Sequence, residues 1–578
     1  MLPTRRRIAR HRVAVTLLAT VVPIATALVF TPFAVRIVDP THDGFMLKTA
    51  LDVMDGRRLF RDTFSQYGAL TPWMHAGVLV MFGPTLAALK LWTVALYAIT
   101  AALLFGTWSR LMPLGLALLG WLIWLALPPF YEARLAMLAW PSVTALVFQA
   151  LGLFSLARLG YASSAPRWAA VAGVSAVLAQ WARTPVGLLH LAATAMALVL
   201  LAAASRSGGR LRREGAAFVV GVVLTEMIFF GILAAQGSVV DWWTQTVLWP
   251  AQWVTHRARS LREVFACLLP VARLEVRGGT GTRPDTGALV ALIVAVSALP
   301  AARALRAPRW RWLALAAAEG ILVPIVLMRD SVLVEAPLAW ALLVPLITLG
   351  VAVMGAAVAV RGTAPGPTLA GIGVVLPALS AWQQYVPVAD YRHLFWGMSP
   401  ALGICLYALY VLAGRRSLPV ALLALLLVGP LWHSRWQQAR AKLAEPMRPI
   451  RGVPLLAGMR DLDSHSTELE RLAHTIQDWN VGHPGTAIVL MGRQGLVAAL
   501  APDRSNYWPI YLPREAFPVT TEETVARERF IAARRPLIWV DFVTPDEFEA
   551  ILTRYGYRPL TEPDLYKGTL LAPIEPLA

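Results

Sequence analysis

The chain has 578 residues, of which 57% are hydrophobic and only 15% charged, and its mean hydropathy of +0.58 excludes an ordinary soluble globular protein. The formal net charge of +18 could indicate a nucleic-acid partner, but the basic residues lie mostly in short gaps between apolar runs, as membrane topology requires. The sequence therefore predicts an integral membrane protein with no nucleic-acid partner. The two cysteines, Cys267 in a loop and Cys405 in an apolar run, are not expected to form a disulfide.

The first apolar run covers residues 13–35 and follows the basic sequence RRRIARHR. The positive-inside rule places the N-terminus in the cytoplasm, and the run is too long for a removable signal peptide, so we expect a permanent anchor. Immediately after it, Asp39 and Asp43 reach the outer face within the sequence VDPTHDGFMLKTALDVMDGRRLFRDTFSQYG. Acidic, basic and aromatic residues gathered beside a span indicate a functional site, although an ordinary solvated loop is the alternative.

The first outer loop, residues 36–84, is predicted to form two interfacial helices. In FMLKTALDVMD, helical spacing separates an apolar set from a charged set, which comprises Lys48, Asp52 and Asp55. Residues 70–83 are short for a span and begin with Pro72, Trp73 and His75. Counting them as a crossing would turn the arginine-rich gaps outward, so we expect this helix to lie in the interface as well.

Apolar runs of about twenty residues predict about thirteen transmembrane helices. Gaps expected inside carry many arginines against the single acid Glu214, whereas the short outer gaps contain matched acids and bases. An odd number of crossings puts the C-terminus outside. The predicted spans are 13–35, 85–107, 113–128, 138–157, 168–182, 185–204, 215–236, 286–303, 312–328, 336–358, 366–382, 396–413 and 418–433.

Two further regions are expected outside the membrane. The outer loop 237–285 is rich in tryptophan, which suits a membrane-interface belt or a platform for sugar rings. Residues 1–433 form the predicted transmembrane domain, and residues 434–578 a soluble, extracytoplasmic α/β domain. There TAIVLMG and PLIWVDFV are strand-like, and TPDEFEAILTRYG has a capping box and a terminal glycine typical of a helix. No catalytic motif stands out in this domain, so we expect it to pack against or cover the membrane domain.

This plan resembles the GT-C superfamily of membrane glycosyltransferases, which includes the aminoarabinose transferases and the protein O-mannosyltransferases. The resemblance is carried mainly by residues 39–68: an acid, an interfacial helix, Gly56, RDTFSQYG, and then a proline-containing segment. The chain has two nearby aspartates where the aminoarabinose transferases have one clear acid, and Ala69-Leu70-Thr71-Pro72 where they have Lys-Pro-Pro. The resemblance implies a multi-pass protein of the bacterial plasma membrane that transfers a hexose or pentose with inversion. Its implied partners are a polyprenyl-phosphate-linked sugar donor, a lipid, glycan or protein acceptor, and membrane lipid.

Such a transfer requires a base for the acceptor hydroxyl and cations for the departing phosphate. Asp43 is our first candidate for the base and Asp39 the second, although either could instead cap the following helix. Arginines at span ends could also be interfacial anchors rather than ligands. We expect no cofactor, and no cluster of residues has metal-ligand spacing. The candidate phosphate ligands are Arg183 and Arg392, followed by Lys48, Arg58, Arg61 and Arg134, and the candidate sugar or acceptor contacts are Tyr67, Asp390, Tyr391 and His393.

A polytopic transporter or lipid flippase of envelope biogenesis is the main alternative, and a non-catalytic scaffold is a third. Transporters usually contain internal repeats with broken helices in matching positions, and this sequence contains no such repeat. An early acidic cap and a single late soluble domain favour an enzyme.

Overall fold

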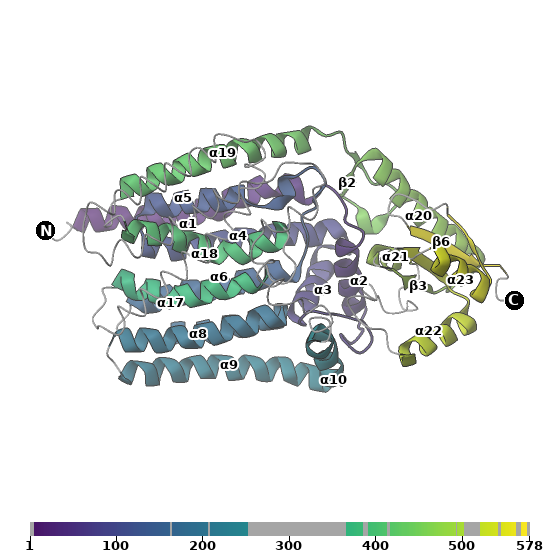
Figure 1. Ribbon diagram of the computed structural model, residues 1–578, viewed down its shortest axis with the longest axis horizontal. Helices are drawn as coiled ribbons and strands as arrows, with labels where there is room; N and C mark the ends of the chain where they lie inside the picture. The colour runs from purple at the N-terminus through teal and green to yellow at the C-terminus, as the bar shows by residue number, and fades with distance from the viewer. Residues whose placement is uncertain are drawn as a thin grey trace.

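The computed structural model describes a helical bundle with an α/β domain at one end, and the N-terminus lies at the other end (Figure 1). It describes residues 5–161, 165–205, 208–251, 366–384, 391–412, 417–492, 494–501, 521–541, 545–561 and 568–574. The predicted spans 286–303, 312–328 and 336–358 lie outside these ranges.

The other ten predicted spans correspond to helices of the bundle. Among the described residues, α1, α4, α6, α8 and α9 are long and apolar enough to cross a membrane, and shorter apolar helical stretches occur at Leu70–Phe82, Leu114–Ala126 and Phe395–Val411. The prediction of a polytopic α-helical membrane protein is confirmed. The bundle helices are α1 (Arg5–Ala34), α4 (Leu86–Leu111), α5 (Leu114–Ala126), α6 (Pro141–Tyr161), α7 (Pro166–Ala182), α8 (Thr184–Ala204), α9 (Gly208–Gln236), α17 (Gly366–Ser380), α18 (Tyr391–Leu412) and α19 (Ser417–Ala444).

Buried aromatic side chains and a few polar contacts join the helices. α6 packs against α4, α7 and α17, and α7 also packs against α9. The indole N–H of Trp124 donates to Ser399 Oγ at 2.8 Å, and that of Trp396 donates to Tyr97 Oη at 3.0 Å. These bonds fix α18 against α5 and α4, since a buried indole N–H is stabilised by an acceptor.

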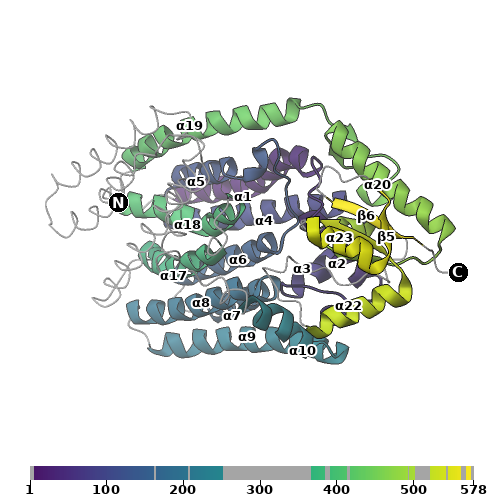
Figure 2. The same ribbon diagram turned by 45° about the vertical axis from the view of Figure 1, so that its right-hand side comes forward.

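The first loop forms a cap between the bundle and the α/β domain (Figure 2). It contains α2 (His42–Met54) and α3 (Leu70–Phe82), which confirms both predicted helices. However, α2 is not a half-exposed interfacial helix, because every residue from Asp43 to Asp52 is buried. The short helix α21 (Gly495–Leu500) covers it so closely that a Cβ on Gly44 would lie 2.0 Å from the Leu496 backbone nitrogen.

The α/β domain contains a two-stranded and a four-stranded sheet. β1 (Arg448–Pro449) pairs antiparallel with β2 (Arg460–Asp461). The larger sheet has the order β3 (Ile488–Met491), β4 (Leu537–Asp541), β6 (Gly568–Pro573), β5 (Tyr557–Pro559), and only the β3–β4 pair is parallel. The helices of the domain besides α21 are α20 (Asp463–Gly482), α22 (Thr521–Arg534) and α23 (Pro545–Tyr555).

The strand-like sequences TAIVLMG and PLIWVDFV are β3 and β4, and the predicted helix after Thr544 is α23. α23 ends before Gly556, whose φ of 65° suits a glycine at a helix C-terminus. Residue 434, the expected domain boundary, falls inside α19, which continues to Ala444.

Short helical turns complete the described chain. They are η1 (Pro129–Tyr131), α10 (Val239–Trp243), the π-helical turn η2 (Thr244–Leu248), η3 (Ala381–Gln384) and η4 (Pro454–Leu456). In the tryptophan-rich loop, Trp242 is buried and stacks on Trp181 of α7 with ring centroids 5.0 Å apart, whereas Trp243 is 48% exposed. Trp242 therefore anchors α10 to the bundle.

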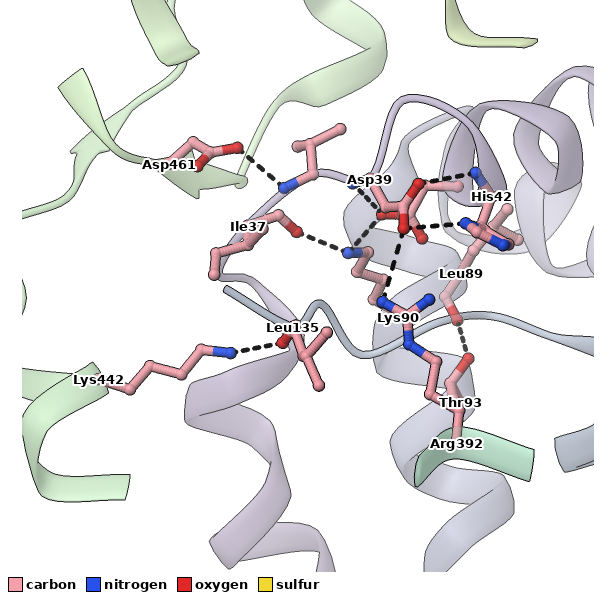
Figure 3. A network of polar contacts seen from close by, with 12 residues as sticks. Ile37, Asp39, His42, Leu89, Lys90, Thr93, Leu135, Arg392, Lys442 and Asp461 are labelled. Atoms are coloured by element: carbon pink, nitrogen blue, oxygen red, sulfur yellow. Dashed lines mark hydrogen bonds and ion pairs between the residues drawn. The ribbon is translucent and has the colours of Figure 1, made fainter. Parts of the chain in front are cut away.

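A buried lysine ties the end of α19 to the rest of the bundle. Lys442 Nζ donates to the carbonyl oxygens of Phe130, Glu132 and Leu135 at 2.6 to 3.0 Å, and Figure 3 shows the last of these contacts. Arg36, just after α1, donates to the carbonyl oxygens of Lys442 and Leu443. The start of the α/β domain is thereby fixed beside the loop that carries the two aspartates.

Candidate active site

The two aspartates lie at the junction between α1 and α2. Asp39 precedes α2, and its Oδ1 accepts the backbone N–H of His42 at 2.9 Å, so it caps the start of the helix. Its Oδ2 lies 2.9 Å from His42 Nδ1 and 3.6 Å from an amino nitrogen of Arg392 on α18 (Figure 3). Asp43 lies in the first turn of α2. Both first-loop acids therefore gather at one point, together with an arginine from a distant helix.

Asp43 is fully buried, and its two oxygens have different surroundings. Oδ2 pairs with Lys90 Nζ of α4 at 2.7 Å and accepts the backbone N–H of Asp39 at 2.9 Å. Oδ1 is also buried and has no hydrogen-bond partner among the described residues. Lys90 Nζ additionally donates to the carbonyl oxygen of Ile37 at 2.8 Å. A charged pair from two elements thus lies beneath the loop, with one carboxylate oxygen unsatisfied.

The two carboxyl groups are driven in opposite directions by their surroundings. Burial raises the pKa of Asp43, and the charge of Lys90 offsets only part of this effect. Burial alone would also raise the pKa of Asp39, but the hydrogen bonds and charge of His42 and the charge of Arg392 hold that pKa well below its usual range. Neighbouring acids whose pKa values are pushed apart are typical of sites where one acid exchanges protons and the other stays ionised.

An aromatic cluster lies beside the acids. The Trp140 ring, at the start of α6, meets the His42 ring edge to face at 5.0 Å and the Tyr67 ring at 5.3 Å. Arg183, at the junction of α7 and α8, lies over Tyr67 at 5.9 Å from the ring centre. Burial raises the pKa of Tyr67, so its phenol stays protonated at neutral pH. Trp140 therefore lies between His42, beside the acids, and Tyr67, which in turn contacts Arg183.

Arg183 also reaches polar residues within the bundle. It donates to Ser142 Oγ and, at 3.4 Å, to Gln384 Oε1, and Gln384 Nε2 donates to Gln149 Oε1 at 3.2 Å. The guanidinium Nε of Arg392 is buried and has no hydrogen-bond partner in the described part of the chain. Arg392 thus lies directly beside Asp39, whereas Arg183 is linked to the acids only through the rings of Tyr67, Trp140 and His42.

The remaining candidate phosphate ligands lie elsewhere. Lys48 and Asp52 form a fully buried ion pair inside α2. Arg58 pairs with Asp62 at 2.9 Å on the surface, and Arg61 contacts the carbonyl of Gly237 at 3.4 Å. Arg134 is exposed. None of these described contacts brings a cation to Asp39 or Asp43.

The candidate contacts at the start of α18 are only partly described. Asp390 and the side chain of Tyr391 lie outside the described residues. His393 packs edge to face on Trp396 at 5.3 Å, one turn along the same helix. In the part of the chain that the structure describes, no group of three His, Cys, Asp or Glu side chains is placed to hold a metal ion.

Sequence reasoning missed two residues of the site. Lys90 carried a usable signal, because a lone lysine within an apolar run is costly unless it is paired. Trp140 immediately precedes the proline that starts α6, and a tryptophan at a span end is usually interpreted as an interfacial anchor.

No protein family and no curated protein matches the chain in sequence. Among solved structures, it is similar to ArnT from Cupriavidus metallidurans bound to undecaprenyl phosphate, with 14% identity, a TM-score of 0.45, and coverage of 96% of this chain and 97% of that chain. It is also similar to the apo form of the Archaeoglobus fulgidus oligosaccharyltransferase, with 13% identity, a TM-score of 0.46, and coverage of 90% and 69%.

Proposed function

We propose that the protein is a membrane glycosyltransferase that moves a sugar from a polyprenyl-phosphate carrier to a hydroxyl group of a lipid, glycan or protein acceptor. The observation that carries this proposal is the buried carboxylate of Asp43, with Oδ2 held by Lys90 and Oδ1 without a hydrogen-bond partner among the described residues. A buried carboxylate oxygen that receives no hydrogen bond costs free energy. The hydroxyl group of the molecule that receives the sugar can donate the missing hydrogen bond. The resemblance of residues 39–68 to the GT-C superfamily supports the same function.

Asp43 is the better base of the two. Its pKa is raised by burial, which brings its proton affinity closer to neutral pH, whereas the pKa of Asp39 is lowered by His42 and Arg392. Asp39 then orients His42 and Arg392 and holds the first turn of α2. Because Asp43 is fully buried, acceptor binding is coupled to a movement of the cap that covers it.

The reaction is a single displacement. The acceptor hydroxyl transfers its proton to Asp43 Oδ1, and its oxygen forms a bond to the anomeric carbon of the sugar. The bond from that carbon to the carrier phosphate breaks, and its electron pair leaves with the phosphate. The configuration at the anomeric carbon is inverted, and Asp43 later loses its proton to water. The protein contributes orientation and charge, because the phosphate is already a good leaving group.

Arg183 is the proposed ligand of the carrier phosphate, since it lies at a span end beside Tyr67 and the polar side chains of Ser142 and Gln384. Arg392, which also pairs with Asp39, contributes further positive charge. Tyr67 and Trp140, whose rings pack 5.3 Å apart, are the proposed contacts for the C–H surface of the sugar once the cap has moved. Asp390, Tyr391 and His393 remain the proposed acceptor contacts.

The site is proposed to face the outside of the bacterial plasma membrane, with the N-terminus in the cytoplasm. The location of the N-terminus and of the α/β domain at opposite ends of the bundle supports this orientation (Figure 1). The α/β domain and the outer loop 237–285 then lie on the extracytoplasmic side, together with the acids.

The test uses the full-length protein in liposomes containing polyprenyl phosphates that carry labelled sugars, mixed with candidate lipid, glycan and peptide acceptors. We expect the label to appear in an acceptor while free polyprenyl phosphate accumulates, and Asp43→Asn protein to leave the label on the carrier. A flippase would instead leave the label on the carrier and expose it on the other leaflet. That result, with every acceptor unlabelled, would overturn the proposal.

A further inference from the structure

The α/β domain pairs directly with the loop that carries the acids. The backbone N–H of Arg460 in β2 donates to the carbonyl of Val35 at 2.8 Å, and the N–H of Ile37 donates back to the carbonyl of Arg460 at 2.9 Å. The N–H of Val38 donates to Asp461 Oδ2 at 2.9 Å (Figure 3). The chain immediately before Asp39 is thus joined to the edge of this domain by a parallel β-bridge between Arg36 and Arg460.

This pairing holds an unfavourable backbone conformation. Ile37 has a φ of 65°, in the left-handed region that is costly for a β-branched side chain. Its side chain is buried, so the residue cannot easily rotate away. A strained residue persists only where its surroundings hold it. Here Arg460 bonds to the backbone of Val35 and Ile37, and Asp461 bonds to the backbone of Val38.

The strained turn has a consequence for the site. With this backbone, the carbonyl of Ile37 accepts a hydrogen bond from Lys90 Nζ at 2.8 Å, and the same ammonium group pairs with Asp43 Oδ2 at 2.7 Å. The next residues, Val38 and Asp39, bring the Asp39 N–H to that same Asp43 oxygen. The conformation of residues 37–39 therefore determines which oxygen of Asp43 stays unsatisfied.

The carboxylate of Asp461 is itself held in place by neighbouring groups of the α/β domain. The side chain is fully buried, and Oδ1 accepts the N–H of Leu462 at 2.8 Å and lies 3.3 Å from His465 Nδ1. These contacts fix the carboxylate in one orientation, so that Oδ2 points at Val38. A buried carboxylate that accepts backbone N–H groups is a strong and directional contact.

We propose that Asp461 is a positioning residue for sugar transfer: the α/β domain uses it to lock residues 37–39 in the conformation that orients Asp43 and Lys90. This inference rests on the proposed glycosyltransferase function. It gives the domain a direct part in forming the site, in contrast to the covering or packing role expected from the sequence.

The test compares Asp461→Asn with Asp463→Asn, a matched control two residues further on whose side chain is 83% exposed. We expect Asp461→Asn to lower kcat by about tenfold to a hundredfold with little change in the donor KM, because a small misplacement of reacting groups costs that much. Adding Ile37→Gly should restore part of kcat, since glycine adopts a φ near 65° without strain. Asp463→Asn should behave as the wild type.

Hydrogen–deuterium exchange gives a second readout that needs no activity. We expect Asp461→Asn to accelerate exchange in peptides covering residues 35–45, and the control variant to leave them protected. Unchanged exchange and unchanged kcat in Asp461→Asn, or a loss of thermal stability with normal kcat, would overturn the positioning role. If the wild type transfers no sugar but the exchange result holds, the proposed function fails while Asp461 is still shown to hold the loop.

Discussion

The buried pair of Lys90 and Asp43 yields the sharpest stability prediction, tested by Lys90→Met. Both side chains are fully buried and lie 2.7 Å apart, so methionine would leave an unpaired carboxylate in a dry environment. Breaking such a pair from one side typically costs about 3–5 kcal/mol, and the carbonyl of Ile37 would lose its charged donor as well. We expect a loss of unfolding free energy of this order and a clear fall in unfolding temperature.

The assay is thermal unfolding of the detergent-solubilised full-length protein, followed by tryptophan fluorescence. The double variant Asp43→Asn/Lys90→Met should be more stable than Lys90→Met alone, because no buried charge is left without a partner. Arg58→Met is the matched control, since its ion pair with Asp62 is on the surface and should leave the unfolding temperature unchanged. Wild-type stability in Lys90→Met, or no recovery in the double variant, would refute this account of the pair.

Three further predictions follow from the site and the topology. Arg183→Ala should raise the donor KM by about tenfold to a hundredfold with little change in the acceptor KM, and Arg183→Lys should raise the donor KM less. Donor titrations measure both effects, and a normal donor KM in both variants would show that Arg183 does not bind the phosphate. Because the pKa of Asp39 is lowered in the folded state, its ionisation stabilises the protein above pH about 4, and this stability is lost as the pH falls below that value. Asp39→Asn should therefore reduce the dependence of the unfolding free energy on pH across that acidic range. An unchanged pH dependence would contradict the lowered pKa. Reporter fusions should place residue 500 outside and the N-terminus in the cytoplasm, and a cytoplasmic signal at residue 500 would overturn the proposed orientation.

The helical bundle could be predicted because hydropathy and loop charge act locally along the sequence. The predicted starts and ends of the spans match the described helices within a few residues in most cases, and α19 is longer because its polar final turns carry no hydrophobic signal. The environment of α2 could not be predicted. Its amphipathic pattern indicated a water interface, but α21, which lies far along the chain, packs on α2, and Lys48 and Asp52 are buried.

The two acids of the site could be predicted from the sequence, but the residues that contact them could be predicted only in part. Asp39 and Asp43 stand out because acids beside a span are rare, and Arg392 stands out at a span end. The pairing of Asp43 with Lys90 depends on how α2 packs on α4, and the bond from Val38 to Asp461 depends on how a distant strand docks on the loop. Neither register is encoded in local sequence pattern, so only the folded structure reveals them.

The central claim is that Asp43 accepts the proton of the acceptor hydroxyl, and single-turnover sugar transfer by Asp43→Asn protein tests it most directly. Donor and enzyme are mixed with an acceptor that the wild type uses, and the rate of label transfer is compared with that of Asp39→Asn and of the double variant. The account predicts a loss of about a hundredfold to ten-thousandfold for folded Asp43→Asn protein, and a smaller loss for Asp39→Asn. A larger loss in Asp39→Asn would move the base to that residue, and near-normal rates in both single variants and the double variant would contradict a carboxylate base altogether.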